Sequence, residues 1–392
     1  MTDDFDALLA AQSTAEQHKR PKHPSGWDPH VEVCGDVATA VSEPLEQADA
    51  RHDDLIRGWQ LDPAEWRIVG NVNVRRWQRY DHEWLYYYKA DLQRIDPSVA
   101  ADTEALFKLC RSRKPLKPVK AVTGGPTFLV LIGDTQIGKG DGDGSEGTVV
   151  RWMTSLEGTA ARARKVKPAQ VAVAFMGDLR EGCTGNYPGQ KYSSDLTVTQ
   201  QDAVLQELIF ATLDRFASTT PDLLVMAVPG NHGEERDNGQ AYTLASDNHD
   251  VAVVQTVQRG IRLNQNGAFD HLRFMYPYDQ ELAVAADLSG VPVGFAHGHQ
   301  FRGPGKAEDW WKDQAHNKTK VGDCDLLISA HYHHLRVAQG GRKSWLQIPS
   351  LDGGSQWWEN KTGQHSPPGM VSLLVGEGLG PAGCGWDDLK VI

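Results

Sequence analysis

Short apolar runs, each closed by glycine or polar residues, recur over the last two-thirds of the chain. Runs of roughly four to eight apolar residues bounded by turn residues are typical of strands that are buried on both faces. On this basis, strands are predicted at 127–133, 170–177, 223–228, 291–296, 325–330, 343–348 and 370–375.

Longer stretches with a helical spacing of apolar positions lie between these strands. They predict helices at 148–165, 196–216, 248–263 and 306–317. Because alternating strands and helices are typical of layered α/β domains, we expect one large α/β domain at 127–392.

The first third of the chain is organised differently. Residues 1–26 are polar and interrupted by proline, which predicts a flexible tail. Residues 27–110 are rich in tryptophan and tyrosine, and we interpret them as a small α+β module. The basic, proline-containing stretch at 111–126 has the composition of a linker. Within the module we expect a helix at 53–60, paired strands at 68–77 and 83–90, and a second helix at 97–110.

Composition narrows the classes of protein. The chain has 392 residues, 40% of them hydrophobic and 23% charged, which is sufficient for a globular core. The formal net charge of −11 excludes nucleic-acid binding through the overall electric field, so such binding would require a local basic patch.

Cysteine usage and hydropathy bear on the compartment. The five cysteines are scattered and form no CxxC pair, which is typical of reduced thiols in a cytoplasmic protein. The first residues are acidic and do not resemble a signal peptide, and no run of about 18 apolar residues predicts a membrane span. We therefore expect a cytoplasmic location and no membrane association. The sequence is compatible with a homodimer.

Five polar segments stand where predicted strands end. Each contains aspartate, asparagine, glutamine or histidine, and the first four also contain glycine; they lie at 133–138, 177–181, 230–234, 296–299 and 330–333. Carboxylate, amide and imidazole groups at strand ends are suitable ligands for divalent cations. Five such segments in one chain predict a two-metal hydrolase.

Oxygen ligands are expected from three of these segments. Two divalent cations about 3.5–4 Å apart need several donors and one shared oxygen ligand. Asp178, directly after Gly177, is predicted to bridge the two ions, while Asp134 would bind the first and the side-chain carbonyl of Asn231 the second.

Nitrogen ligands are expected from the last two segments, at His297, His331 and His333. Because side chains at i and i+2 of an extended segment share one side, His331 and His333 can each reach a different ion. His232 follows Asn231 and is predicted to protonate a leaving oxygen or to stabilise transition-state charge.

The motif order GDxQxG, GDxxE, GNHxE, HGH and AHxH resembles the calcineurin-like metallophosphoesterases over residues 127–348. The resemblance implies a four-layer α/β/β/α sandwich and a metal-bridging hydroxide that attacks phosphorus in line. It implies one metal site at Asp134, Gln136, Asp178 and His333, a second at Asp178, Asn231, His297 and His331, and a catalytic histidine at His232.

The motifs depart from the family pattern at three positions. Gln136 stands where the family usually has histidine, Glu181 where aspartate is commoner, and Ala330 where glycine is usual. A glutamine oxygen is a hard donor, which favours Mn²⁺ or Mg²⁺ over softer ions, although Fe and Zn²⁺ stay open. The alternative is that Gln136 binds no metal and leaves the first site weak. His299 and His334 are interpreted as neighbours of the ligands.

Several residues near the motifs are predicted to contact substrate. Arg302 and Lys306 follow the fourth motif, where a substrate phosphate would need cations, and Trp310 and Trp311 offer stacking surfaces. The alternative is a packed helix with solvated basic residues. Arg180 and residues 186–192 after the second motif are similar candidates, and Asn231 is also expected to contact substrate.

The leading hypothesis is a metal-dependent phosphodiesterase acting on nucleic acid, in the manner of a phage-encoded nuclease. It depends on the arginines and aromatics of the N-terminal module and on the basic linker. The first alternative is a small substrate such as a cyclic nucleotide or a nucleoside-diphosphate compound, which the acidic chain suits equally well. The second is a catalytically degenerate binding protein.

Overall fold

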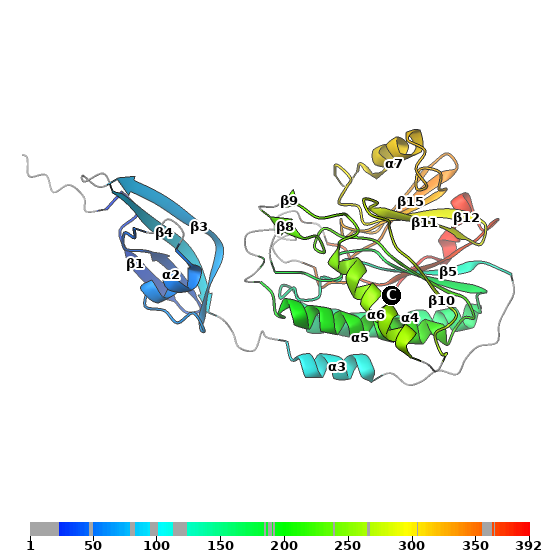
Figure 1. Ribbon diagram of the computed structural model, residues 1–392, viewed down its shortest axis with the longest axis horizontal. Helices are drawn as coiled ribbons and strands as arrows, with labels where there is room; N and C mark the ends of the chain where they lie inside the picture. Colours follow the sequence, from blue (N-terminus) through cyan, green and yellow to red (C-terminus); the bar gives the residue numbers. More distant parts are fainter. Residues whose placement is uncertain are drawn as a thin grey trace, which may run out of the picture. The chain divides into compact units, whose positions relative to one another are not determined.

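The computed structural model describes residues 23–46, 50–78, 83–94, 101–112, 124–183, 186, 190, 193–237, 240–264, 267–303, 305–354, 363 and 365–392. The chain divides into two compact units, Met1–Pro97 and Ser98–Ile392 (Figure 1). Most of the predicted tail, at 1–22, and most of the predicted linker, at 113–123, lie outside the described residues.

The first unit is an antiparallel sheet with one helix. Its strands lie in the order β1-β2-β4-β3, and helix α2 spans His52–Gly58. The strands are β1 His30–Cys34, β2 Val37–Val41, β3 Trp66–Gln78 and β4 Trp84–Arg94. The long pair β3–β4 confirms the predicted pairing of 68–77 with 83–90. Ile68 and Leu92 of this pair are fully buried in a core that includes Leu55 of α2.

Helix α3, Thr103–Arg111, belongs to the second unit. Its Leu106 and Cys110 are buried in the core that the helices of that unit share with a sheet. The unit boundary therefore falls at Pro97, whereas the sequence assigned 97–110 to the N-terminal module. The apolar face of α3 packs against the core of the second unit. The periodicity of apolar residues along α3 does not specify which core the helix packs against.

The described residues of the second unit form two large sheets and one two-stranded sheet. The six-stranded sheet has the order β10-β7-β6-β5-β16-β17, and the five-stranded sheet has the order β11-β12-β13-β15-β14. The first comprises β5 Thr127–Ile132, β6 Gln170–Phe175, β7 Leu223–Ala227, β10 Leu272–Met275, β16 Val371–Val375 and β17 Lys390–Val391. The second comprises β11 Ala283–Leu288, β12 Val291–Ala296, β13 Leu326–Ser329, β14 Arg336–Gly340 and β15 Lys343–Gln347. In both sheets the central strands run parallel.

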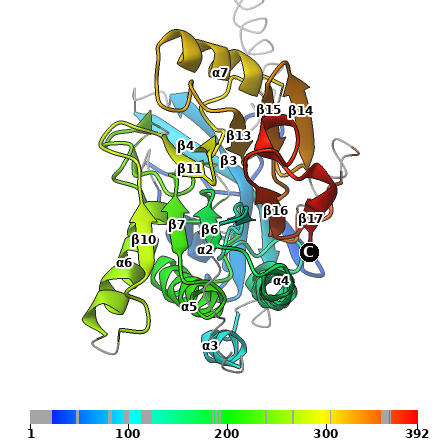
Figure 2. The ribbon, with the colours of Figure 1, turned by 90° about the vertical axis from the view of Figure 1, so that its right-hand side faces the viewer.

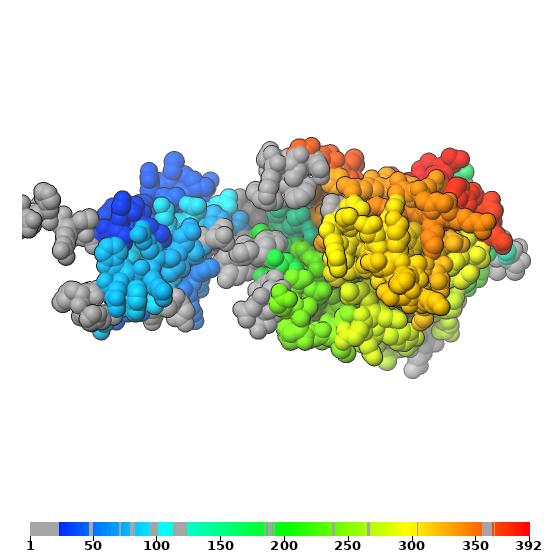
Figure 3. Space-filling model, turned by 90° about the horizontal axis from the view of Figure 1, so that it is seen from above, coloured from blue at the N-terminus to red at the C-terminus, as the bar shows by residue number. Residues whose placement is uncertain are grey.

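Helices cover the outer faces of both sheets (Figure 2). The six-stranded sheet packs against α4 Gly144–Val166, α5 Val198–Ala217 and α6 His249–Leu263. The five-stranded sheet packs against α7 Ala307–His316, which faces the viewer in Figure 3. A third apolar cluster lies between the two sheets. These layers confirm the predicted α/β/β/α sandwich.

Strand β5 shows why the prediction of buried strands succeeded. Its residues alternate between the helix-facing core, through Val130 and Ile132, and the core between the sheets, through Leu129 and Leu131. Because both faces are buried, the strand is apolar throughout. Small elements complete the unit: the hairpin of β8 Arg236–Asp237 and β9 Gln240–Ala241, and the 3₁₀ turns η3 Pro381–Gly383 and η4 Trp386–Asp388. None of the helices described is long and apolar enough to cross a membrane.

Candidate metal centre

The polar segments predicted from the sequence meet where central strands of both sheets end. Asp134 follows β5, Asp178 follows β6, Asn231 and His232 follow β7, His297 follows β12, and His331 and His333 follow β13. Carboxyl ends of parallel strands converge at one edge of a sheet, where open α/β folds place their ligand sites. The fold therefore gathers side chains that are up to about 200 residues apart, as in the hydrogen bond from His331 N–H to Asp134 Oδ2 at 2.8 Å.

Asp178, His297 and His331 form the tightest group. Each offers one ligand atom, and these atoms lie within 4.8 Å of one another. His297 Nε2 is 3.1 Å from Asp178 Oδ2. The other nitrogen of His297, Nδ1, lies 2.7 Å from the carbonyl oxygen of Met176 and donates to it. This bond directs Nε2 toward the group, which is how metal-binding histidines are usually oriented.

Three buried atoms at the site have no hydrogen-bond partner among the atoms described: Asp134 Oδ1, Asn231 Oδ1 and His297 Nε2. More than about 90% of buried polar groups in proteins are hydrogen-bonded. Three buried polar atoms without a hydrogen bond at one site therefore need an explanation. A carboxylate oxygen, an amide oxygen and an imidazole nitrogen are all ligands of divalent cations. The residues present therefore fit a bound divalent ion.

The backbone is strained at five of the predicted ligand and neighbour positions. The φ angles are 49° at Asp134, 41° at Gln136, 50° at Asp178, 69° at His331 and 57° at His333. Residues other than glycine in this left-handed region cost of the order of 1–3 kcal/mol each and cluster at functional sites. The left-handed conformation turns the backbone sharply where each strand ends, so that the side chain enters the site.

Two glycines allow the loops after β6 and β7 to touch. A Cβ atom on Gly177 would lie 2.8 Å from the Cα of Gly230 and 2.8 Å from His297 Nδ1, and the φ of Gly177 is 85°. No side chain fits there, which explains the glycines before Asp178 and Asn231 by close backbone approach.

Asp134, Gln136 and His333 lie beside this group, with different partners. His333 Nε2 is 3.4 Å from Asp134 Oδ1, and its Nδ1 is 3.8 Å from Asp352 Oδ1. Gln136 Oε1 accepts a hydrogen bond from Lys139 Nζ at 3.0 Å. The oxygen that the sequence assigned to a metal is thus bonded to a cation of the protein.

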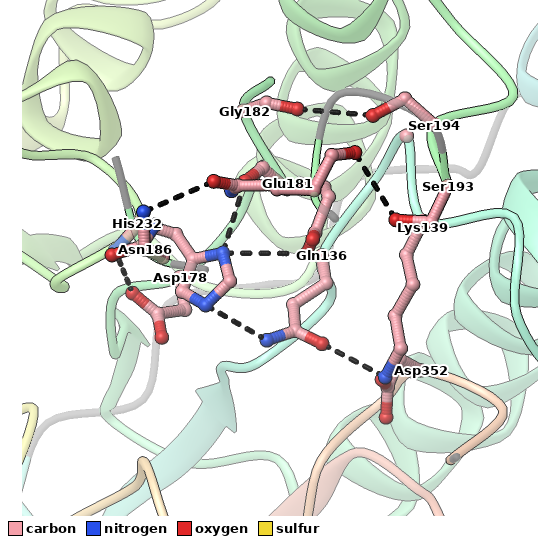
Figure 4. Close-up of polar contacts among 12 residues, drawn as sticks. Gln136, Lys139, Asp178, Glu181, Gly182, Asn186, Ser193, Ser194, His232 and Asp352 are labelled. Atoms are coloured by element: carbon pink, nitrogen blue, oxygen red, sulfur yellow. Dashed lines mark hydrogen bonds and ion pairs between the residues drawn. The ribbon is translucent and has the colours of Figure 1, made fainter. Parts of the chain in front are cut away.

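His232 is held on three sides (Figure 4). Its backbone N–H donates to Asp178 Oδ1 at 2.8 Å, its Nδ1 lies 2.9 Å from the carbonyl oxygen of Glu181, and its Nε2 lies 3.5 Å from Gln136 Nε2. Burial lowers the pKa of His232, but the charge of Asp178 and the contacts with Glu181 outweigh burial and raise it to about 10. The imidazole thus carries a proton at neutral pH, and a cation bound nearby would weaken this effect.

Burial lowers the pKa of His297 and of His333, but the charges of Asp178 and Asp134, respectively, outweigh it and raise both. His331 and His299 behave differently. Burial and then the charge of His297 lower the pKa of His331 to about 4 and that of His299 to about 3. A neutral imidazole is the form that binds a metal ion. Burial would raise the pKa of Asp178, but the charges of His297 and His232 hold it well below its usual value. Asp178 is therefore a carboxylate at neutral pH.

No protein-family model matches the chain, and no curated protein matches it. Solved structures are similar at low identity. Vacuolar protein sorting 29 from Cryptosporidium parvum is 16% identical with a TM-score of 0.30, covering 64% of this chain and 87% of its own. A novel archaeal phosphodiesterase is 9% identical with a TM-score of 0.31, covering 68% and 98%. A purple acid phosphatase from seeds of yellow lupin (Lupinus luteus) is 11% identical with a TM-score of 0.33, covering 87% and 68%. Similarity at this level assigns no family and no activity.

The predicted substrate residues differ in their surroundings. Arg180 is 7% exposed, and its NH1 lies 3.4 Å from Asp202 Oδ1. Lys306 is exposed and pairs with Asp309 of α7 at 2.9 Å. Arg302 is exposed on the loop that follows His297. Arg302 and Lys306 are therefore both exposed basic residues, and Lys306 has an acidic partner.

Three charged residues of the site were not predicted. Asp250, in the first turn of α6, accepts hydrogen bonds from the backbone N–H groups of Asp178 and Leu179. Lys139 and Asp352 form an ion pair next to Gln136. His299, interpreted as a neighbour, lies with its ring centre 5.5 Å from that of His297 and its Nε2 3.5 Å from Glu234 Oε1.

Proposed function

We propose that the second unit is a metal-dependent phosphoric ester hydrolase that cleaves phosphodiesters. The observation that carries the proposal is the close approach of Asp178 Oδ2 and His297 Nε2, 3.1 Å apart, together with the buried Asn231 Oδ1, which has no hydrogen-bond partner among the atoms described. The tight group, which also includes His331, favours a divalent cation as its ligand.

Asp178, Asn231, His297 and His331 would hold the ion. When bound, it supplies the positive charge that polarises a phosphoryl oxygen and activates water. His232, protonated through its contacts with Asp178 and Glu181, is placed to donate a proton to the leaving oxygen. Arg302, on the loop after His297, is an available cation for a non-bridging phosphate oxygen.

A nucleic-acid substrate is supported by the first unit. On one face of the β3–β4 pair, Trp84 is 44% exposed and the guanidinium of Arg76 lies 4.9 Å from its ring centre. On the other face, Trp77 is 46% exposed. Arg75 is exposed on the same strand. Exposed aromatic and basic side chains on a sheet are the usual surface for unpaired bases and phosphates. We therefore propose nucleic acid as the substrate, with small nucleotides as the competing candidate.

The proposal is tested by hydrolysis of bis-p-nitrophenyl phosphate beside p-nitrophenyl phosphate, with Mn²⁺ and with a chelator. We expect Mn²⁺-dependent cleavage of the diester and a decrease of roughly 10²–10⁴-fold in His232→Ala, the usual contribution of a general acid. His316→Ala is the matched control, because His316 is exposed on α7, and it should keep full activity. Absence of turnover with every metal, in a protein that binds the metal, would favour a binding role.

A further inference from the structure

The ammonium group of Lys139 contacts Gln136, one predicted ligand of the first metal site. Its Nζ donates to Gln136 Oε1 at 3.0 Å and forms an ion pair with Asp352 (Figure 4). The two charged side chains are 14% and 3% exposed, so this is a buried pair. The Gln136 oxygen that would bind an ion is thus hydrogen-bonded to a positively charged group of the protein.

The backbone holds Lys139 in this position. Its own N–H donates to the carbonyl oxygen of Gln136 at 2.9 Å, which closes a tight turn. On the other side, Lys139 forms an antiparallel bridge with Ser194, and the next residue, Gly140, donates to the carbonyl oxygen of Ser193 at 2.7 Å. The ammonium is therefore presented by a turn that is bonded on both sides.

The oxygen of the Gln136 amide is engaged. Its Oε1 accepts from Lys139, and its Nε2 lies 3.5 Å from Nε2 of His232. Rotation of the amide would place its NH₂ group against the ammonium, with two donors facing each other. An ion on Oε1 would therefore have to displace the Lys139 ammonium from this oxygen or share the oxygen with it.

An ion bound through Gln136 would also be repelled. Oxygen ligands lie about 2.0–2.6 Å from Mg²⁺ or Ca²⁺, so an ion on Gln136 Oε1 would stand within roughly 6 Å of Lys139 Nζ. Two cations at that distance in a buried site repel strongly. By contrast, among the contacts described, no lysine or arginine reaches Asp178, His297 or His331.

We propose that the centre holds one divalent ion, at Asp178, Asn231, His297 and His331, and that the Lys139 ammonium supplies the second positive charge in place of a second ion. On this proposal Gln136 is not a metal ligand, and His333 lies between the Asp134 carboxylate and the Asp352 carboxylate that pairs with Lys139. The inference rests on the metal centre of the proposed function but not on turnover.

The test is a count of bound ions in the full chain. The protein is stripped with chelator, incubated with excess Mn²⁺, passed over a desalting column and analysed for manganese per chain by mass spectrometry. We expect one ion in the wild type and in Lys139→Arg, which keeps the charge. We expect two in Lys139→Met, which frees Gln136 and Asp352. Lys165→Met removes an exposed charge of α4 and should bind one ion.

The outcomes separate the two proposals. Two ions in the wild type would overturn the inference and leave the proposed function standing. One ion in both wild type and Lys139→Met, with circular dichroism showing that the variant is folded, would also overturn it, because the lysine would then not be what excludes the second ion. No ion in any variant would overturn the metal centre itself. If Lys139→Met does not fold, the wild-type count and Lys139→Arg still decide between one ion and two.

Discussion

Asp250 Oδ2 accepts a hydrogen bond from the backbone N–H of Asp178 at 2.8 Å, so the central ligand is fixed from the first turn of a helix 72 residues further along the chain. The same carboxylate accepts from the N–H of Leu179 at 2.9 Å and of Gly230 at 3.1 Å. It thus joins the loops after β6 and β7. The left-handed backbone at Asp178 is held by these bonds, which connect the core of the helix layer to the site.

Replacement of Asp250 by asparagine is expected to destabilise the protein and impair metal binding. The new NH₂ group would face backbone donors, and a buried unsatisfied group costs about 1–3 kcal/mol. The free energy of unfolding, measured with urea, should fall by that amount. Asp247→Asn, an exposed carboxylate three residues earlier, should leave it unchanged. Equal stability of the two variants would contradict this role of Asp250.

The pKa of His232 predicts a specific pH dependence in the metal-free protein. Its pKa in the folded state is about 10, above the ordinary value of 6.5. A raised pKa stabilises the folded state fully below the unfolded value, and this stabilisation is lost as the pH rises from 6.5 to 10. A difference of one between the pKa of the folded and of the unfolded state corresponds to about 1.4 kcal/mol.

The check on His232 compares urea unfolding of wild type and His232→Asn at pH 6 and at pH 9.5, with chelator present. The wild type should be more stable than the variant at pH 6, and the difference should shrink at pH 9.5. Effects of His297 and the other histidines are present in both proteins and cancel to first order. A difference that is constant with pH would show that His232 does not gain a proton on folding.

Gly177→Ala is expected to disrupt the site, whereas Gly260→Ala should stabilise the protein. A Cβ on Gly177 meets backbone atoms of Gly230 at 2.8 Å, and the φ of 85° adds strain. We expect a loss of about 1–3 kcal/mol in unfolding free energy and weaker Mn²⁺ binding. Gly260, inside α6, has nothing within 4 Å of a new Cβ, so alanine should add about 0.5–1 kcal/mol. Thermal melting and calorimetric metal titration measure both effects.

The layers of the fold could be predicted because buried parallel strands are apolar along their whole length. Strands at the sheet edges were missed for the opposite reason. In β11, alternate residues from Ala283 to Asp287 are only partly buried or exposed, and small side chains give weak periodicity. A two-residue turn at Ser289 and Gly290, with positive φ at both, joins β11 to β12. This turn was the feature of the sequence from which β11 could have been predicted. The turn at Gly35 between β1 and β2 is similar.

For the site, the motifs at strand ends identified residues that lie together in the structure, including Asp178, His297 and His331. Asp250 was not predicted as part of it, because an acidic residue in the first turn of a helix is expected from the helix dipole alone. Lys139 was not distinguished from an ordinary loop lysine, since only the tertiary fold brings Asp352 to it. Asp352 follows β15, as the predicted ligands follow their strands. Its position after a strand could have identified it as a residue of the site.

The exposed aromatic and basic hairpin of the first unit gives the prediction that separates the two substrate classes. If the substrate is single-stranded nucleic acid, Arg76→Ala with Trp84→Ala should reduce hydrolysis of a DNA oligonucleotide, because stacking contributes about 1–3 kcal/mol per base, or roughly 5–150-fold. Cleavage of bis-p-nitrophenyl phosphate should not change. Val33→Ala, an exposed change on β1, is the control. Activity on DNA should also fall steeply between 50 and 200 mM salt, as phosphate contacts require. Unchanged DNA cleavage in the double variant, with a flat salt dependence, would favour a small nucleotide substrate.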